Sequence, residues 1–170
     1  MTKPGTSTDL LKTEIVLKNE ENLERIKTCL DQLNENQIWH RSNSHTNSIA
    51  NLILHLNGNI TQYILSSLGK EPDERQRAVE FSIEKGTNKE ELILLISKCI
   101  SKANQVIRET KEQRLLKEEI VQGFQMTGLS NLVHVCEHLS YHTGQISLLT
   151  KIITNQDLRF YDNLDLDQTN

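Results

Sequence analysis

The chain has 170 residues, enough for one domain with a single hydrophobic core and too few to predict two. Its formal net charge of -4 and the lack of any lysine or arginine run argue against nucleic acids and anionic membrane surfaces as partners. Two prolines, seven glycines and many Leu, Ile, Glu, Lys and Asn residues favour long helices.

The N-terminal stretch MTKPGTSTDL is polar and lacks the apolar core of a secretory signal. No stretch of the sequence approaches the roughly 20 apolar residues that a membrane span needs. A cytoplasmic location is therefore expected.

The three cysteines, Cys29, Cys99 and Cys136, lie far apart and form no C-x-x-C pair. This spacing argues against both a disulfide framework and a zinc ribbon. We expect reduced, partly buried thiols, which is how free cysteine usually packs.

The first predicted helix covers about residues 8–34, where apolar residues recur at three- and four-residue intervals. The next segment, NENQIWHRSNSHTNS, is rich in Asn, Ser and His and has no period, so it predicts a connector. Trp39 is expected to be its hydrophobic anchor. His40 and His45 are expected to be ordinary loop histidines, with one of them at a pocket mouth as the alternative.

A second helix is predicted over about residues 47–68, because apolar residues from Ile49 to Ile64 fall on one side of a helical wheel. Gly69 and Pro72 then provide stop signals. His55 sits at the border of the apolar stripe, where it can face a neighbouring helix. The charged stretch 70–86, KEPDERQRAVEFSIEKG, predicts a long crossover with room for one short helix.

Thr87 and Glu90 fit a capping box ahead of an apolar stripe, which predicts a third helix over about residues 88–110. Gly123 and Gly128 are turn or break signals in the next stretch. The fourth predicted helix then covers about residues 129–154. Four amphipathic helices can bury their stripes against one another, so the predicted fold class is an all-α four-helix bundle in one domain, residues 1–170. The long crossover can join parallel neighbours, so a simple up-down-up-down order is not required.

Three histidines, His134, His138 and His142, recur every four residues on one face of the predicted fourth helix. Two histidines four residues apart can bind one metal ion, whereas a third lies two turns from the first. On the helical wheel His142 and His138 lie nearest the apolar stripe, and His134 points furthest toward solvent.

His138 and His142 together with His55 make a candidate metal site of three imidazoles. Such a site leaves one coordination position open for water or substrate, and it suits Zn²⁺, Ni²⁺, Fe²⁺ or Co²⁺. The alternative is that each histidine hydrogen-bonds a neighbour or faces solvent without a metal.

The segment from His134 to His138 also spells H-x-x-E-H, the pattern of inverzincin metallopeptidases, in which Glu137 would act as base. Those enzymes need a further ligand on a separate helix and a large scaffold. Glu137 projects away from the apolar stripe, so we expect a solvated side chain and no peptidase.

Two glycines, Gly58 and Gly144, lie inside predicted helices, where glycine costs about 1 kcal/mol relative to alanine. Glycine at such positions predicts a close contact with a neighbouring helix. The alternative is a gap beside the metal.

Two motifs resemble those of a known family. They are Ser48–Leu56 (SIANLILHL), with the pattern Ser-x-x-x-Leu-x-x-His-Leu, and His138–Ile146 (HLSYHTGQI), with a His-x-x-x-His pair followed by Gly-Gln. With the polar, tryptophan-bearing linker, they resemble the DinB/YfiT-like metalloenzyme superfamily of four-helix bundles over nearly the whole chain. The resemblance implies that His55, His138 and His142 are the metal ligands.

The resemblance also implies a metal-dependent S-transferase that uses a low-molecular-weight thiol such as bacillithiol, with zinc, nickel or iron as the ion. A metal-bound thiol is deprotonated and can attack an electrophile as a thiolate. Polar residues at the pocket edge would orient the thiol or a small-molecule substrate; the candidates are Asn51, Asn59, Tyr141 and Gln145.

Two other functions stay open. One is metal-dependent hydrolysis of a small molecule, and the other is a non-catalytic, metal-binding, stress-related bundle, because fold does not settle function. Whether the chain is an enzyme is therefore undecided at this point, and a homodimer is one possible assembly.

Overall fold

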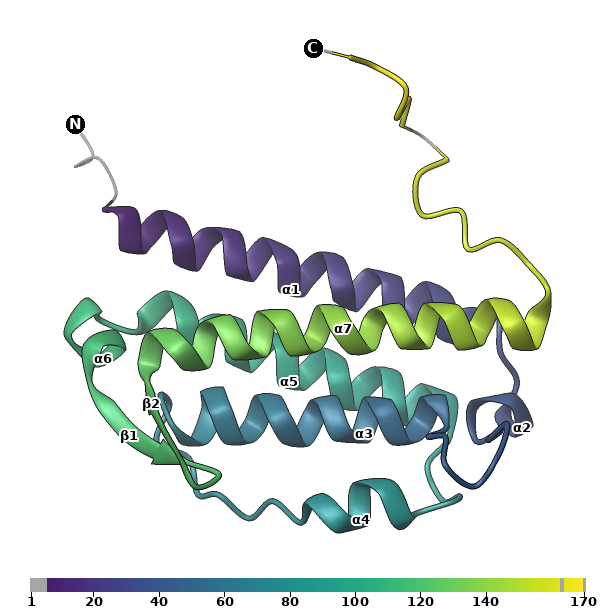
Figure 1. Ribbon diagram of the computed structural model, residues 1–170, viewed down its shortest axis with the longest axis horizontal. Helices are drawn as coiled ribbons and strands as arrows, with labels where there is room; N and C mark the ends of the chain where they lie inside the picture. The colour runs from purple at the N-terminus through teal and green to yellow at the C-terminus, as the bar shows by residue number, and fades with distance from the viewer. Residues whose placement is uncertain (1–5, 163, 170) are drawn as a thin grey trace.

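The computed structural model describes residues 6–162 and 164–169, and in this part of the chain four long helices form a bundle (Figure 1). They are α1 (Ser7–Asp31), α3 (Ile49–Ile60), α5 (Lys89–Glu109) and α7 (Gly128–Thr154). A π-helical segment, η1 (Thr61–Ser66), continues α3. The predicted all-α four-helix bundle is confirmed. Residues 1–5, 163 and 170 of the expected single domain, and with them the start of the polar N-terminal stretch, lie outside the described residues.

Short polar side chains set where the long helices begin. Capping boxes start three of them, with Thr6 ahead of α1, Ser48 ahead of α3 and Asn88 ahead of α5. In each box the capping side chain accepts a hydrogen bond from the third helical N–H, which would otherwise lack a partner. The box predicted at Thr87 and Glu90 is therefore wrong by one residue: Asn88 and Glu91 form it.

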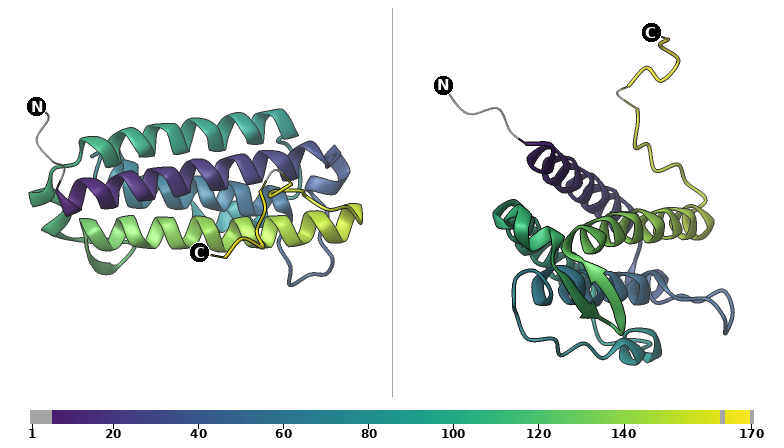
Figure 2. Two further views of the ribbon diagram at one scale, coloured as in Figure 1. Left: turned by 90° about the horizontal axis from the view of Figure 1, so that it is seen from above. Right: turned by 60° about the vertical axis from the view of Figure 1, so that its left-hand side comes forward.

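Each long helix packs against two others: α1 contacts α5 and α7, and α3 contacts the same two helices. Figures 1 and 2 show that α1 and α7 run in one direction while α3 and α5 run in the other. The chain must therefore return along the whole bundle between the parallel helices α3 and α5. The long crossover does this, passing over the outer side of α3.

The connections hold the remaining elements: α2 (Glu35–Ile38), α4 (Arg77–Ser82), α6 (Glu112–Leu116), β1 (Glu118–Val121) and β2 (Phe124–Thr127). The crossover does contain one short helix, α4. The sequence did not predict α6 or the antiparallel hairpin. Gln122 and Gly123 have φ of 52° and 83°, and two successive residues with positive φ make the tight turn that suits a hairpin.

The bundle core is aliphatic, with Ile26, Leu30, Ile53, Leu56, Ile96 and Ile100 among the largest fully buried side chains. Trp39 packs on this core, and its Nε1 donates to the carbonyl of Thr87 at 3.1 Å, as expected of an anchor. The three cysteines are free thiols, two buried and one half-buried. In the described part of the chain, no helix has both the length and the apolar content to cross a bilayer.

Candidate metal centre

Three histidines from two antiparallel helices converge at one point of the bundle. His55 of α3 and His138 and His142 of α7 each present one ring nitrogen, and these nitrogens lie within 4.8 Å of one another. The Nε2 atoms of His55 and His138 are only 2.8 Å apart. The i, i+4 spacing on α7 and the facing position on α3 thus bring together the three predicted ligands, which can hold a metal ion.

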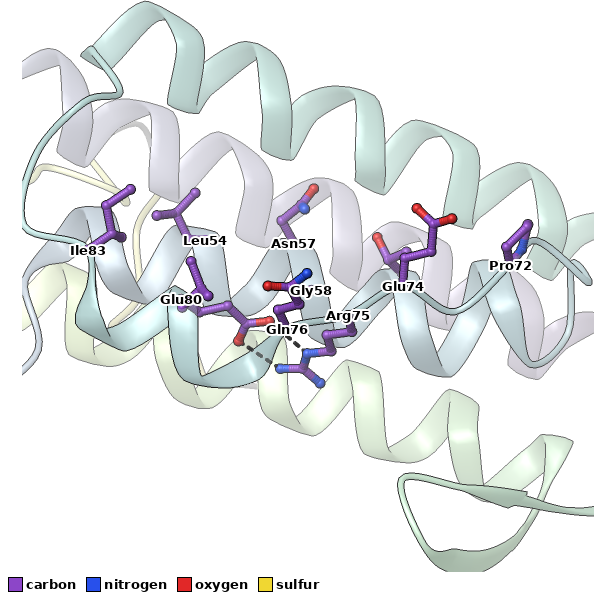
Figure 3. Close-up of a pocket in the computed structure, with 11 residues that line it drawn as sticks. Leu54, Asn57, Gly58, Pro72, Glu74, Arg75, Gln76, Glu80 and Ile83 are labelled. Carbon is purple, nitrogen blue, oxygen red and sulfur yellow. Dashed lines mark hydrogen bonds and ion pairs between the residues drawn. The ribbon is translucent and has the colours of Figure 1, made fainter.

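The ring of His55 is fixed from the crossover. Its Nδ1 lies 2.9 Å from Oε2 of Glu80. Oε1 of Glu80 in turn pairs with the Arg75 guanidinium at 2.7 Å, and Figure 3 shows this pair. Arg75 Nη2 also lies 3.2 Å from the same Nδ1. We take the shorter contact as the hydrogen bond, because the arginine N–H already donates to Glu80 Oε2 at 2.9 Å.

The protonation of Glu80 decides which nitrogen of His55 bears the proton. Burial alone would raise the pKa of this carboxyl, but hydrogen bonds from Arg75 and His55 outweigh burial and lower it. An ionised carboxylate can only accept, so Nδ1 of His55 is the donor and Nε2 keeps its lone pair. That lone pair faces the other two histidines.

His142 is fixed within its own helix. Its Nδ1 donates to Oε1 of Gln145 at 2.6 Å, one turn further along α7. Its Nε2 is therefore the nitrogen left for a ligand bond. Burial lowers the pKa of His142. Burial, reinforced by the positive potential of His142, His55, His134 and Arg75, lowers the pKa of His138 to about 3. These two rings are thus neutral at pH 7, as a metal ligand must be.

His134 does not face open solvent. The side chain is half-buried and its Nε2 accepts a hydrogen bond from Nδ2 of Asn59 at 3.0 Å. Its ring centroid lies 4.2 Å from that of Tyr63 and 5.2 Å from that of His138. Of the three histidines on α7, His142 is buried and His134 is half-buried, which agrees with their order on the helical wheel. The end of α3 and the start of η1 nevertheless cover this side of α7, so the ring of His134 is not solvated. It is nevertheless not one of the three converging ligands.

The four residues proposed to orient a substrate lie in different surroundings. Asn59 lines a cavity at the centre, and Gln145 supports His142. Tyr141 is largely exposed and only its ring contacts the site, with its centroid 5.0 Å from that of His142. Asn51 is fully buried at the start of α3, where its amide donates to the carbonyls of Glu80 and Ile83. The polar atoms of Asn51 are thus engaged in holding the crossover.

A cavity of about 330 Å³ opens beside the histidines. Its wall combines imidazole, amide, guanidinium and aromatic groups, from His55, Asn59, Arg75, Arg77, Gln122, Phe124, His134 and His138. The hairpin supplies Gln122 and Phe124, so the element that the sequence did not predict closes one side. A larger, mostly apolar groove of about 480 Å³ lies under the crossover, beside Gly58 and the Arg75–Glu80 pair (Figure 3).

The other histidines and Glu137 lie away from this cavity. His40 and His45 are exposed in the connector, and His45 lines a separate groove with Gln145 and Leu148. Glu137 is exposed on the outer side of α7, as expected of a solvated residue. The H-x-x-E-H pattern therefore does not bring its acid to the triad.

The two glycines inside long helices differ in the space around them. A Cβ on Gly58 would lie 2.0 Å from Oε1 of Glu80 and 2.9 Å from Nε of Arg75, so a close contact does exist there. Its partner is the Arg75–Glu80 pair, and Glu80 lies on the short helix α4, so the expected contact with a neighbouring helix exists here. A Cβ on Gly144 would meet no atom within 4 Å, which contradicts the expected contact at that position.

Glu80 and Arg75 are the site residues that sequence reasoning missed. They lie in a charged stretch with no apolar period, so the sequence pattern could not predict that their side chains point toward α3. One signal was available: a crossover between parallel helices must run along the bundle, which brings its charged residues past α3. A buried charge needs an opposite charge nearby, and the stretch supplies both signs.

Comparison with known proteins identifies the family and the fold of the chain. A family model described as "Protein of unknown function (DUF1572)" matches residues 7–162. The crystal structure of a DinB-like protein, YjoA, from Bacillus subtilis is similar, with a TM-score of 0.65 and 14% identity over 85% of this chain and 94% of that one. A conserved protein from Enterococcus faecalis has a TM-score of 0.70 and 15% identity over 90% of this chain and 100% of its own.

No curated protein matches the chain. At 14% and 15% identity the two solved structures define the fold alone. Their fold is the helical bundle that the resemblance to the DinB/YfiT-like superfamily implied. By the match over residues 7–162, the chain belongs to the family described as Protein of unknown function (DUF1572), and its fold is that of the DinB-like proteins.

Proposed function

We propose that this protein is a divalent-metal-dependent S-transferase that uses a low-molecular-weight thiol such as bacillithiol. The observation that carries the proposal is the convergence of His55, His138 and His142 beside an open cavity of about 330 Å³. A non-catalytic bundle would need the ion but no such cavity. The combination of the two supports an enzyme.

The residues present fit a divalent ion. Nδ1 of His55 donates to Glu80 and Nδ1 of His142 donates to Gln145, which leaves an Nε2 lone pair on each ring. His138 is neutral at pH 7. Neutral imidazoles suit Zn²⁺, Ni²⁺ and Fe²⁺. Three protein ligands are the number that catalytic zinc sites use when one position serves the substrate.

A divalent ion bound here would favour the thiolate form of a thiol at neutral pH. In the transfer, the S–H proton leaves to solvent, sulfur forms a bond to the electrophilic carbon, and the leaving group departs with the electrons of the broken bond. The chain's own residues would bind and orient the reactants. Asn59, Gln122 and His134 offer polar contacts in the cavity, and Phe124 offers an apolar surface.

A transfer assay tests the proposal. Purified protein is stripped with chelator, reloaded with Zn²⁺, Ni²⁺ or Fe²⁺, and given bacillithiol, glutathione or 2-mercaptoethanol with a chromogenic electrophile. We expect a metal-dependent rate above the uncatalysed reaction, lost in His142→Ala. Equal rates with and without metal for every thiol would reject the transferase.

One observation favours a second candidate, a metal-dependent hydrolase. His134 lies in the cavity wall with its ring centroid 5.2 Å from that of His138, so a possible general base stands beside the triad. A panel of small esters and amides separates the two activities. Hydrolysis that is metal-dependent and falls at least about 100-fold in His134→Asn would favour the hydrolase.

The assembly and location of the protein belong to the same proposal. We place it in the cytoplasm and propose a homodimer, for which α7 offers exposed apolar side chains at Leu129, Val133, Tyr141, Leu148 and Ile152. Sedimentation velocity at micromolar concentration checks the dimer. A single species at the monomer mass of 19.5 kDa would exclude it.

A further inference from the structure

We propose that Glu80, held by Arg75, is a positioning residue of the metal centre: it fixes His55 as the Nδ1–H tautomer, with Nε2 available to the ion. The inference rests on the proposed metal site and adds a function for the crossover. The crossover would then be part of the centre and not merely a connection between α3 and α5.

The contacts of Glu80 leave it little freedom. One carboxylate oxygen faces Nδ1 of His55 at 2.9 Å, and Arg75 donates to both oxygens at 2.7 and 2.9 Å. The side chain of Arg75 is 3% exposed, and its remaining Nη1 donates to Gln62 of η1 at 2.9 Å. A guanidinium that grips both oxygens of a carboxylate sets its orientation as well as its charge.

The backbone that bears Glu80 is held as well. The buried amide of Asn51 donates to the carbonyl of Glu80 at 2.9 Å and to that of Ile83 at 2.8 Å. Arg41 donates to the carbonyl of Phe81 at 2.6 Å and to Oδ1 of Asn51 at 2.9 Å. The start of α3 therefore anchors the same short helix that supplies the carboxylate to His55, one turn further along α3.

Gly58 completes the arrangement. It lies on α3 three residues after His55, and an added Cβ would come within 2.0 Å of Oε1 of Glu80. Any other residue type at position 58 would force this oxygen away, and with it the contact to His55. Glycine costs about 1 kcal/mol in a helix relative to alanine. At position 58 this loss of helix stability leaves room for the Arg75–Glu80 pair.

The consequence for the metal is chemical. A histidine that donates its second N–H to a carboxylate has a fixed ring orientation and a more basic ligand nitrogen, and loss of such a partner typically weakens metal binding by about 10–100-fold. In the metal-free protein the fixed tautomer also assigns the 2.8 Å contact between the two Nε2 atoms. His138 is the donor there and His55 the acceptor.

The experiment combines two readouts on wild type, Glu80→Gln, Gly58→Ala and Gly144→Ala. Long-range ¹H–¹⁵N NMR of the chelated protein reports the tautomer of His55, and chelator competition gives the affinity for Zn²⁺. Gly144→Ala is the matched control, because it is also a glycine-to-alanine change inside a long helix but meets no atom within 4 Å.

We expect His55 to bear its proton on Nδ1 in wild type and in Gly144→Ala. In Glu80→Gln the amide oxygen can still accept from Nδ1, so the tautomer should persist while the stronger, charged acceptor is lost. Zinc affinity should fall about 10–100-fold in Glu80→Gln and in the same direction in Gly58→Ala, and stay within about twofold in Gly144→Ala. Gly58→Ala keeps every charged residue and improves helix propensity, so its loss of affinity would not reflect a damaged fold.

Two results would overturn the proposal. One is an Nε2–H tautomer of His55 in the metal-free wild type, and the other is wild-type zinc affinity in both Glu80→Gln and Gly58→Ala. If the wild type bound no divalent ion at all, the proposed function would fail separately. The tautomer measurement would still decide whether Glu80 fixes the ring.

Discussion

Oε1 of Gln145 accepts a hydrogen bond from Nδ1 of His142 at 2.6 Å, so this ligand is oriented by a neighbour on its own helix. The partner of His55, by contrast, comes from a segment 25 residues away in sequence. His55 and His142 thus have the same Nδ1–H tautomer, but one is fixed by a distant partner and the other by a partner on its own helix. A short-range partner depends only on α7, whereas a long-range partner depends on the folded crossover.

The Gln145 contact predicts a graded effect on metal affinity. Gln145→Leu removes the acceptor and should weaken Zn²⁺ binding by about 10–100-fold, while Gln145→Glu keeps an acceptor and should retain most of the affinity. Competition against a chromophoric chelator measures both. Equal weakening by the two substitutions would show that side-chain volume, and not the hydrogen bond, matters at this position.

The stoichiometry of binding follows from the one histidine cluster found among residues 6–162 and 164–169. Stripped and reloaded protein should bind about one divalent ion per chain, and His142→Ala should remove most of the affinity because two imidazoles remain. His134→Ala is the matched control, since His134 lies on the same helix but outside the cluster. Metal analysis by mass spectrometry measures both variants. Wild-type metal content in His142→Ala would rule out the triad as the site.

Arg77 predicts a preference for anionic thiols. It lines the cavity, its guanidinium lies 5.0 Å from the Phe81 ring centroid, and no carboxylate pairs with it within 4 Å among the described residues. Arg77→Gln should raise KM for a carboxylate-bearing thiol by roughly 5–50-fold, equivalent to about 1–2.3 kcal/mol, and leave 2-mercaptoethanol unaffected.

Arg159→Gln controls for net charge in that experiment, because it removes one arginine from the exposed C-terminal segment. An equal rise in KM for charged and neutral thiols in Arg77→Gln would show that the substitution disturbs the cavity in general. The anion preference would then be wrong, whatever the outcome for the transfer reaction itself.

Acid should weaken the attachment of the hairpin. A hydrogen bond from Arg114, supported by Lys70, lowers the pKa of Glu119 from 4.5 to about 2. A carboxyl whose pKa is lower in the folded state adds stability above pH 4.5, and this stability is lost as pH falls from 4.5 toward 2. Glu119→Gln should therefore lower the melting temperature at pH 7 by roughly 2–4 °C, for about 1 kcal/mol, because the pair is partly exposed.

The same comparison below pH 3 provides the decisive contrast. There the carboxyl is protonated in the unfolded chain, and as pH approaches 2 it becomes protonated in the folded chain too, so the difference in melting temperature between wild type and Glu119→Gln should shrink. Glu118→Gln, an exposed change on the same strand, should behave like wild type at both pH values. A difference that persists unchanged at low pH would contradict an electrostatic origin.

The sequence predicted what depends on local periodicity. The four long helices and the direction of His55, His138 and His142 follow from the 3.6-residue period, because an apolar stripe must face the core. For His134 the helical period alone does not predict the surroundings of the side chain. The wheel measures direction relative to the helix's own stripe, and it cannot show that Asn59 and Tyr63 of a neighbouring segment lie over the supposedly solvent-facing side.

The residues that the sequence did not place depend on contacts between distant segments. Glu80 reaches His55 only because the crossover runs back over α3. Residues 70–86 have no apolar period from which this contact could be predicted. The hairpin was missed for a different reason. Gln-Gly is a weaker signal than Asn-Gly for a two-residue turn, and its flanking strands are only four residues long.

An ion at the triad would also act as a cross-link. His55 and His138 are 83 residues apart, and the chain between them contains the crossover, α5 and the hairpin. In the unfolded chain these positions are far apart and do not form the site, so at a free metal concentration 100 times Kd the ion stabilises the folded state by about 2.7 kcal/mol. The lifetime of this protein in the cell would then follow the supply of its metal, since metal-starved chains would unfold and be degraded first.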